Sequence, residues 1–435
     1  MSREVYTPNC GVRNRCVDRS THSVVNSMAN RATLTAWRAS RVRRERAPLV
    51  PVPRVAPTQA PQVSDEVDGP DRATGSRSNS DEWTPAETAI ATIRVGGRVH
   101  DITVRPDGEH VYVARSDSVM VINGRHHIVA RIPLSRPAKS LVMGADGRQL
   151  FVVDYDRSVL VVDIRDYTAQ TLWRGCASDV VVSPDGRHLY AAHNQVTEGG
   201  ANGVVSVVDI GSATTVATVS VKDVAALTIS PDGSRLYAVS SDQRTYYQYP
   251  AGWLTIIDTA SHAVVEAIAV GACPETVSAS PDGAYVYITH YDTCSVSAVN
   301  LTTGNVTAVA LRDAPLAVVF TPDSAHAYVC NVRSLTVIDT TTHDADDIDT
   351  GDLPRGLQLS PDGKHAYIAN FGIRALSVVD TITNSVATTV GVPGYPEAVA
   401  VSPDGGRLYL GGYWSGAVAV ISVPSICALH TDAAS

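Results

Sequence analysis

The chain has 435 residues, of which 44% are hydrophobic and 18% are charged, and its formal net charge is −9. This composition provides enough apolar side chains for a large core, and the negative balance argues against a general nucleic-acid binder. No apolar run approaches the length of a membrane-spanning helix.

The N-terminal region differs in composition from the rest of the chain. Residues 1–85 contain 13 Arg and 9 acidic residues, net +4, which leaves 22 basic against 35 acidic residues, net −13, for the remainder. A basic stretch at 41–46 is followed by five prolines, so we expect a disordered tail over residues 1–88. Alternatives are a basic helix over 28–46 and a true start at Met28 or later. Residues 1–30 contain no readable signal peptide, so the localisation is unknown: cytoplasmic by default, with cell envelope or secreted as alternatives.

A four-residue turn, Ser183-Pro184-Asp185-Gly186, recurs through the rest of the chain. Pro supplies the φ of a type I turn and Gly accepts φ > 0. Two copies depart from this pattern, with Ala145 in place of Pro and Ser324 in place of Gly, and a left-handed Ser324 costs about 1 kcal/mol. The spacing of 39 to 50 residues is that of four-stranded propeller blades. The eight turn aspartates are Asp107, Asp146, Asp185, Asp232, Asp282, Asp323, Asp362 and Asp404.

Each repeat predicts three strands around its turn and a fourth before the next repeat. The second strand carries Tyr or Phe, interpreted as a packing residue with a solvated hydroxyl. A strand over 90–96 precedes the first turn, and the last repeat lacks a fourth strand before Pro424. We therefore expect an all-β, monomeric protein with a single propeller of eight four-stranded blades at 89–423, closed by strand 90–96, and a short tail at 424–435. Seven blades is the alternative.

Two second strands, Tyr328-Val329-Cys330-Asn331 and Tyr367-Ile368-Ala369-Asn370, resemble the Tyr-Val-Thr-Asn signature of the YVTN-repeat β-propeller family, a WD40-like repeat. The third strands 335–339 and 376–380 are similar to its Val-Ser-Val-Ile-Asp. The resemblance covers about residues 90–422 and implies a propeller of the YncE-like or surface-layer type. The same architecture occurs in propeller lactonases and in haem or quinoprotein domains.

Two ends of the predicted ring have different roles. The Pro-Asp-Gly turns share one end, the turn face, while the loops between strands four and one and between strands two and three share the other, the loop face. We expect a functional site on the loop face, because binding and catalytic residues are most often on loops. There the residue that ends strand two varies between repeats, as is expected of residues on a binding surface. These residues are Arg115, Asp154, His193, Ser240, His290, Asn331, Asn370 and Gly412.

Two insertions, at 194–203 and 241–252, are expected to be loops that project from the loop face. The second contains Tyr246, Tyr247 and Tyr249, rings of the kind that bind proteins or sugars. The alternative is a loop that packs only on itself.

Charged side chains precede several first strands, among them His100, Glu275, Arg355 and Glu397. They predict a channel mouth of mixed charge, with a solvated rim of weak ion pairs as the alternative. No metal site is predicted. His193 and His290 lie in blades that are not adjacent, and an acidic stretch at 344–355 lacks the bidentate Glu of a calcium loop.

No Cys-x-x-Cys motif is present among the seven cysteines, which excludes c-type haem attachment, and we predict no cofactor. Simple pairing about the turn at Asp282 places residue 273 opposite residue 292, so that Cys273 and Cys294 are neighbours. They are expected either to form a disulfide or to remain two thiols, depending on the compartment.

The leading functional hypothesis is a non-enzymatic binding or scaffold protein that presents its loop face to a protein or glycan partner, with no nucleic acid bound by the propeller. No nucleophile elbow, phosphate loop or metalloprotease motif is present. The alternatives are a lactonase-like hydrolase that uses the channel mouth and a haem- or quinone-type redox domain.

Overall fold

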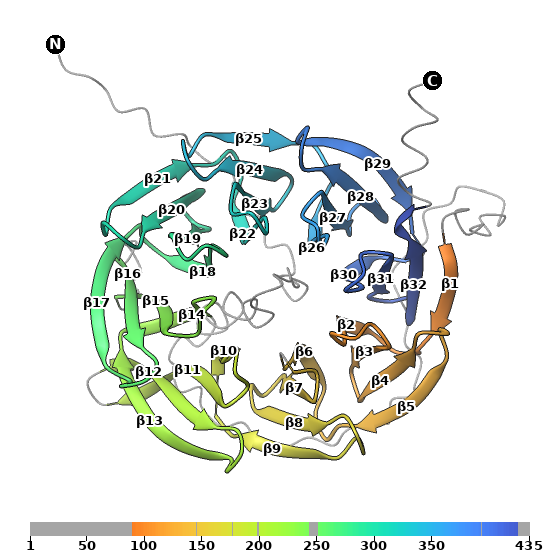
Figure 1. The fold of residues 1–435 in the computed structure, drawn as a ribbon, viewed down its shortest axis with the longest axis horizontal. Helices are drawn as coiled ribbons and strands as arrows, with labels where there is room; N and C mark the ends of the chain where they lie inside the picture. Colours follow the sequence, from red (N-terminus) through yellow and green to blue (C-terminus); the bar gives the residue numbers. More distant parts are fainter. Residues whose placement is uncertain are drawn as a thin grey trace, which may run out of the picture.

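The computed structural model describes residues 89–144, 146–175, 177–197, 200–242, 251–392 and 394–424. Within these ranges the chain is all-β, and eight four-stranded antiparallel sheets form a ring (Figure 1). The prediction of eight blades is confirmed, and the alternative of seven is not. The expected N-terminal tail lies outside the described residues.

Each sheet is one blade, numbered 1 to 8 from β2 onward, with its first strand nearest the ring axis (Figure 1). The inner strands are β2 (Val99–Val104), β6 (Ala138–Met143), β10 (Ala177–Val182), β14 (Asp223–Ile229), β18 (Pro274–Ala279), β22 (Pro315–Phe320), β26 (Pro354–Leu359) and β30 (Pro396–Val401). The second strands are β3 (His110–Arg115), β7 (Gln149–Asp154), β11 (His188–Thr197), β15 (Arg235–Ser241), β19 (Tyr285–His290), β23 (His326–Asn331), β27 (His365–Asn370) and β31 (Arg407–Gly412).

The outer half of each blade faces the perimeter. The third strands are β4 (Ser118–Asn123), β8 (Val159–Asp163), β12 (Gly200–Asp209), β16 (Gly252–Asp258), β20 (Ser295–Asn300), β24 (Leu335–Asp339), β28 (Ala375–Asp380) and β32 (Ala417–Ser422). The fourth strands are β5 (Ile128–Pro133), β9 (Ala169–Trp173), β13 (Thr214–Val221), β17 (Val264–Val270), β21 (Val306–Ala310), β25 (Ala345–Ile348), β29 (Ser385–Gly391) and, from the start of the ring, β1 (Ala89–Arg94).

The ring closes between the two ends of the propeller, as the sequence predicts. Strand β1 pairs antiparallel with β32, so that Thr92 lies opposite Ala419. The amides of Val95 and Gly96 both donate to the carbonyl of Gly416, at 2.9 and 2.8 Å. Strand β1 ends at Arg94 rather than at residue 96, because the chain turns there and Gly96 has φ 69°. Closure gives blade 8 its fourth strand and removes an exposed sheet edge.

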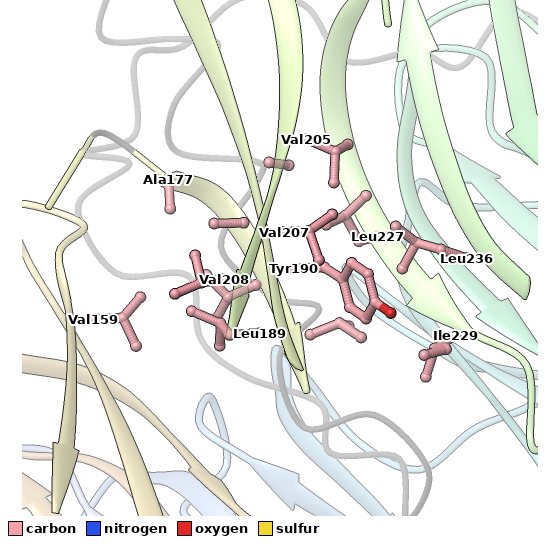
Figure 2. Close-up of a cluster of buried hydrophobic side chains, with 14 of the residues drawn as sticks. Val159, Ala177, Leu189, Tyr190, Val205, Val207, Val208, Leu227, Ile229 and Leu236 are labelled. Atoms are coloured by element: carbon pink, nitrogen blue, oxygen red, sulfur yellow. The ribbon is translucent and has the colours of Figure 1, made fainter. Parts of the chain in front are cut away.

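The hydrophobic core lies between blades. Inner strands such as β2 and β30 are buried along their whole length, whereas outer strands such as β5 are mostly exposed. Figure 2 shows one cluster in which Val159 of blade 2, Leu189 of blade 3 and Leu227 of blade 4 meet. Because each apolar strand packs on the neighbouring sheet, no blade has a complete core of its own.

The second-strand tyrosines are more deeply buried than expected. Tyr287 and Tyr328 are fully buried, and their hydroxyls reach the next blade, where they lie 2.9 Å from His343 Nδ1 and 2.5 Å from Asn384 Oδ1. The prediction of solvated hydroxyls is therefore wrong for these residues. The neighbouring blade supplies the polar partner that sequence reasoning assigned to water.

Several of the eight turns pack against the turn of the preceding blade on the turn face. A Cβ on Gly363 would lie 2.7 Å from Cδ of Pro322 in the preceding blade, and Gly147 is similarly close to Pro106 at 3.0 Å. Ser324, which replaces Gly in blade 6, has φ 60°, which confirms the expected left-handed conformation. Its hydroxyl accepts a hydrogen bond of 3.0 Å from the amide of Asp282 in the preceding turn, which offsets part of the strain.

The first insertion is not a loop. Strands β11 and β12 continue as a ladder through residues 194–203, where Asn194 lies opposite Gly203, so the expectation of a loop at 194–203 is wrong. Of the second insertion, residues 243–250 lie outside the described residues, and with them Tyr246, Tyr247 and Tyr249.

Candidate functional site

A β-bulge recurs at the start of every inner strand. In each blade the pairing with the second strand skips one residue, for example between Val99 and Asp101, and these eight equivalent positions surround the ring axis at the loop face. The bulged residues are His100, Lys139, Ser178, Ala225, Glu275, Leu316, Arg355 and Glu397.

Four of these bulged residues are ionisable and almost completely buried. His100 is 7% exposed, Glu275 and Arg355 are each 6% exposed, and Glu397 is 4% exposed. They are the residues that the sequence placed at a channel mouth, and the structure gives them equivalent positions. Buried charges are costly unless they are paired, and they gather at functional sites more often than elsewhere. Arg355 and Glu397 belong to the adjacent blades 7 and 8, whereas Glu275 lies in blade 5.

The residues that end the second strands are mostly buried, and four of them form one repeated contact. His290, Asn331 and Asn370 have no exposed surface, and His193 is half-buried. Each directs a side-chain nitrogen to a hydroxyl on the adjacent third strand. The pairs are His193 Nε2 with Ser206 at 2.9 Å, His290 Nε2 with Ser297 at 2.8 Å, Asn331 Nδ2 with Thr336 at 2.7 Å, and Asn370 Nδ2 with Ser377 at 2.9 Å. These contacts hold strands two and three together.

Arg115 and Asp154 occupy the same position in blades 1 and 2. Arg115 donates to the carbonyl of Val95 at 2.6 Å, which ties blade 1 to the closing strand, and it lies 3.1 Å from Asp117. Asp154 is 4% exposed and accepts a hydrogen bond of 2.9 Å from the amide of Ser158. Burial raises the pKa of Asp154. Both residues contribute to structure, and ligand binding by them stays a prediction.

The neighbourhood of His290 differs from the expected register. Its Nδ1 lies 2.9 Å from the carbonyl of Ala272, and burial lowers its pKa to about 4. Because Glu275 is bulged, Pro274 pairs with His290. Residue 273 therefore lies beside residue 291, not opposite 292 as simple pairing predicted. Cys273 and Cys294 are both buried and both have left-handed φ. Their disulfide stays a prediction.

A cluster that sequence reasoning missed lies on the loops of blades 7, 8 and 1. We call it the aromatic–arginine patch. It comprises Arg98 from the loop between β1 and β2, Phe371 and Arg374 from the loop between β27 and β28, Tyr395 from the loop between β29 and β30, and Tyr413 and Trp414 from the loop between β31 and β32.

Within the patch the ring of Trp414 packs nearly perpendicular to two other rings, whereas Phe371 and Tyr395 are tilted by 39°. The ring of Trp414 lies 5.1 Å from that of Tyr395, at an interplanar angle of 86°, and 5.1 Å from that of Tyr413, at 75°. Phe371 lies 4.9 Å from Tyr395 on the inner side. Edge-to-face contacts of this kind are each worth about 0.5–1.5 kcal/mol beyond the area they bury. The loops therefore hold Trp414 in a defined orientation.

An arginine stands at each end of this row of rings. The guanidinium carbon of Arg374 lies 4.3 Å from the ring centroid of Tyr395, and its Nη2 donates to that hydroxyl. The guanidinium of Arg98 lies 5.2 Å from the ring of Tyr413 and donates to its hydroxyl at 3.3 Å. Backbone bonds support the arrangement, since Tyr413 N donates to Tyr395 O at 2.9 Å.

The patch is exposed and positively charged. Trp414 is 53% exposed, and Arg98 and Arg374 are exposed as well. Within the described part of the chain neither arginine forms an ion pair, whereas on the same face Arg115 pairs with Asp117 and Lys222 pairs with Asp242. Both guanidiniums instead lie against tyrosine rings, whose quadrupoles attract cations.

Buried members of the bulge ring lie directly beneath the patch. Arg355 lies 5.3 Å from the ring of Phe371, and the ring of His100 lies 5.8 Å from that of Tyr413. The hydroxyl of Tyr155, in blade 2, lies 3.2 Å from His100 Nδ1. The patch and this sector of the ring therefore form one continuous polar and aromatic region.

The repeats contain a sequence signal for the patch, in the residue that follows each second strand. The residue directly after the second strand is aromatic in four repeats, with Tyr155, Tyr291, Phe371 and Tyr413 at this position. The residue just before each of these, which ends strand two, is mostly buried. Which of these rings contact one another depends on the distance between blades. The repeat pattern in the sequence does not give that distance.

Two classes of site receive no support from the described residues. No group of three or more His, Cys, Asp or Glu side chains in them is arranged to hold a metal ion. Nor does any helix among them have the length and apolar character needed to cross a membrane.

Comparison with known proteins supports the fold. No protein-family model matches the chain. The seven-bladed beta-propeller protein Rv1057 of Mycobacterium tuberculosis is 32% identical over 112 residues, which cover 24% of this chain and 28% of that protein. The chain thus matches less than a third of the length of this relative.

A solved structure also resembles the ring. Hydrazine synthase of Kuenenia stuttgartiensis superposes with a TM-score of 0.50 and 20% identity, covering 78% of this chain and 99% of that chain. The shared feature is the β-propeller fold. At this identity the likeness carries no information on activity.

Proposed function

We propose that this propeller is a binding protein that presents its loop face to a protein or glycan partner, and that the aromatic–arginine patch is the contact surface. The observation that carries the proposal is the exposed Trp414, held between Tyr395 and Tyr413 and flanked by two arginines that form no ion pair with any residue the structure describes. Trp, Tyr and Arg are the residue types that dominate binding energy at interfaces.

The packing of the patch lowers the cost of binding. Rings that already contact one another lose little conformational freedom when a partner covers them, so more of the interaction energy appears as affinity. On the turn face, by contrast, prolines such as Pro322 are already packed against the turn of the next blade.

The likeness to YVTN repeats is part of this proposal. The hydrogen bonds of Asn331 with Thr336 and of Asn370 with Ser377 give a structural reason for an Asn at the end of strand two and a hydroxyl in strand three. They support a YVTN-type repeat, in which the propeller is a scaffold and the loops determine the function.

The test uses the full-length protein on arrays of proteins and glycans. We expect one class of partner to be retained, and the change Trp414→Ala to reduce that binding at least about tenfold. The matched control is Val265→Ala on outer strand β17, which removes a side chain of similar exposure, 56%, far from the loop face. Binding that both variants retain equally would assign the contact to another surface.

A hydrolase is the second candidate, because His100, Glu275, Arg355 and Glu397 occupy equivalent buried positions around the axis. Buried acids and bases at one end of a ring favour general acid–base chemistry. A panel of sugar lactones tests it, with the four residues changed together. Turnover that is absent, or unaffected by the quadruple change, would remove this candidate.

A further inference from the structure

We propose that the ligand of the aromatic–arginine patch is an acidic oligosaccharide whose carboxylates bind Arg98 and Arg374 while a sugar ring lies on Trp414. This inference rests on the proposed function and assigns its ligand class. It follows from the order of groups along the patch, in which a guanidinium at each end is separated from the other by the rings of Tyr395, Trp414 and Tyr413.

The two arginines fit carboxylates. A guanidinium presents paired N–H donors that match both oxygens of a carboxylate, and Arg is less strongly hydrated than Lys. Arg98 and Arg374 each donate to a tyrosine hydroxyl, which fixes the side chain and leaves its other donors for a ligand. A ligand with a negative charge at both ends of an apolar face complements this arrangement.

The rings between the arginines fit a sugar. The C–H face of a pyranose is apolar and packs on an indole ring, while its hydroxyls remain in water. Trp414 is supported at its sides by rings at 86° and 75°, and it is the most exposed ring of the patch. It therefore offers one stacking surface for one sugar unit.

Nucleic acid fits this surface less well. Proteins that bind single strands stack successive bases on several open rings and line the backbone with positive charge. Here no two of these rings are parallel, with interplanar angles of 39°, 60° and 86°, and the chain beyond residue 85 carries a net charge of −13, from 22 basic and 35 acidic residues. An oligosaccharide with separated carboxylates meets less repulsion than a strand with a phosphate at each nucleotide.

Arg374 has a left-handed backbone conformation that recurs at this position of the repeat. Arg374 has φ 53°, a left-handed conformation that L-residues avoid, and it comes directly before the third strand β28. In blade 8 the residue directly before β32 is Gly416, with φ 58°, which takes this conformation without strain. In blade 5 the equivalent residue, Cys294, has φ 49°, so this conformation belongs to the loop of the repeat rather than to Arg374 alone.

The experiment measures binding of a short oligogalacturonate to the full-length protein by tryptophan fluorescence and calorimetry. We expect saturable binding that weakens with added salt, and a loss of at least about tenfold for Trp414→Ala and for Arg98→Gln combined with Arg374→Gly. The matched control is Arg333→Gln, which removes one exposed positive charge from the equivalent loop of blade 6 and leaves affinity within about twofold.

Three comparison ligands decide between occupants. The carboxyl-reduced, neutral form of the same oligosaccharide is expected to bind at least about tenfold more weakly. Equal binding of the neutral form, or preference for a single-stranded oligonucleotide or a polyglutamate peptide, would overturn the assignment. If the array partner depends on Trp414 but the oligogalacturonate does not bind, the proposed function stands and this inference falls. If neither binds, both fall.

Discussion

The two faces of the ring are built from the same repeat and differ in almost every other respect. On the turn face nearly identical turns touch, with prolines such as Pro322 packed against Gly363 of the next blade. On the loop face equivalent positions carry different residues, from the buried Glu397 to the exposed Trp414. Contacts on the turn face therefore determine the spacing of the blades, whereas the residues on the loop face differ from blade to blade.

This difference distinguishes two roles for residues that recur from blade to blade. A repeated residue on the turn face contributes to stability through its contact with the next repeat, as in solenoids and other repeat proteins. On the loop face the layer next to the strands, which contains His290 and Asn370, is also structural, and only the layer above it is exposed.

The largest effect is expected where two turns meet. Gly363→Ala places a methyl group 2.7 Å from Pro322 at φ 71°, whereas Gly186→Ala at φ 69° meets no atom within 4 Å. We expect the first change to lower the free energy of unfolding by about 3 kcal/mol and the second by about 1 kcal/mol. Chemical denaturation measures both, and equal losses would show that the turns do not interlock.

The next effect concerns pH and the buried layer of the loop face. His290 titrates near 6.5 when unfolded and at about 4 when folded, so the unfolded state binds the proton more readily. This contribution to the free energy of unfolding is complete above pH 6.5 and is lost as pH falls toward 4, by up to about 3 kcal/mol. His290→Asn copies Asn370, which bonds Ser377 in blade 7.

Denaturation of both proteins between pH 7 and pH 4 measures this difference. The wild-type protein should lose stability relative to His290→Asn as pH falls, because other titrating groups are common to both. A constant difference across this range would mean that His290 is not the group that responds.

A smaller effect, of opposite sign for stability and binding, is expected at the patch. Arg374→Gly removes a left-handed side chain and should keep or raise the free energy of unfolding, by up to about 1 kcal/mol, while it weakens partner binding. Thermal unfolding and the array assay are measured on the same preparation. A large loss of stability would show that the cation–π contact with Tyr395 is structural.

The smallest effect is expected at the one turn without glycine. Ser324→Ala keeps the left-handed conformation but removes the hydrogen bond from Asp282 N, so we expect a loss of about 1 kcal/mol. Ser324→Gly removes both the bond and the strain and should be close to neutral. Denaturation of the two variants separates the contribution of the hydrogen bond from that of the backbone strain. A Gly variant less stable than the Ala variant would contradict this account.

Much of the fold could be predicted from the sequence, because each repeat contains its own strands and turn. Eight blades and closure by the first strand both follow from counting Pro-Asp-Gly and finding an unpaired strand at each end. The register around His290 could not be predicted, since one bulged residue, Glu275, shifts the pairing by one position. The extent of the β11–β12 hairpin was likewise missed, because its residues suit a strand as well as a loop.

The candidate site was predicted only in location. The sequence identified the loop face and the ionisable residues His100, Arg355 and Glu397, which the structure places at equivalent bulges. It did not identify the patch, whose members Arg98 and Trp414 are more than 300 positions apart in the chain. They share one patch because ring closure brings blade 8 beside blade 1, where Arg98 contacts Tyr413.

By itself, then, the sequence determined the number of blades, the order of strands within each, and the face on which residues vary, because all three depend on contacts between neighbours in the chain. Only the tertiary structure decided which loop residues are exposed and which rings and guanidiniums touch. Those contacts depend on the radius and closure of the ring, which result from packing among all eight blades together.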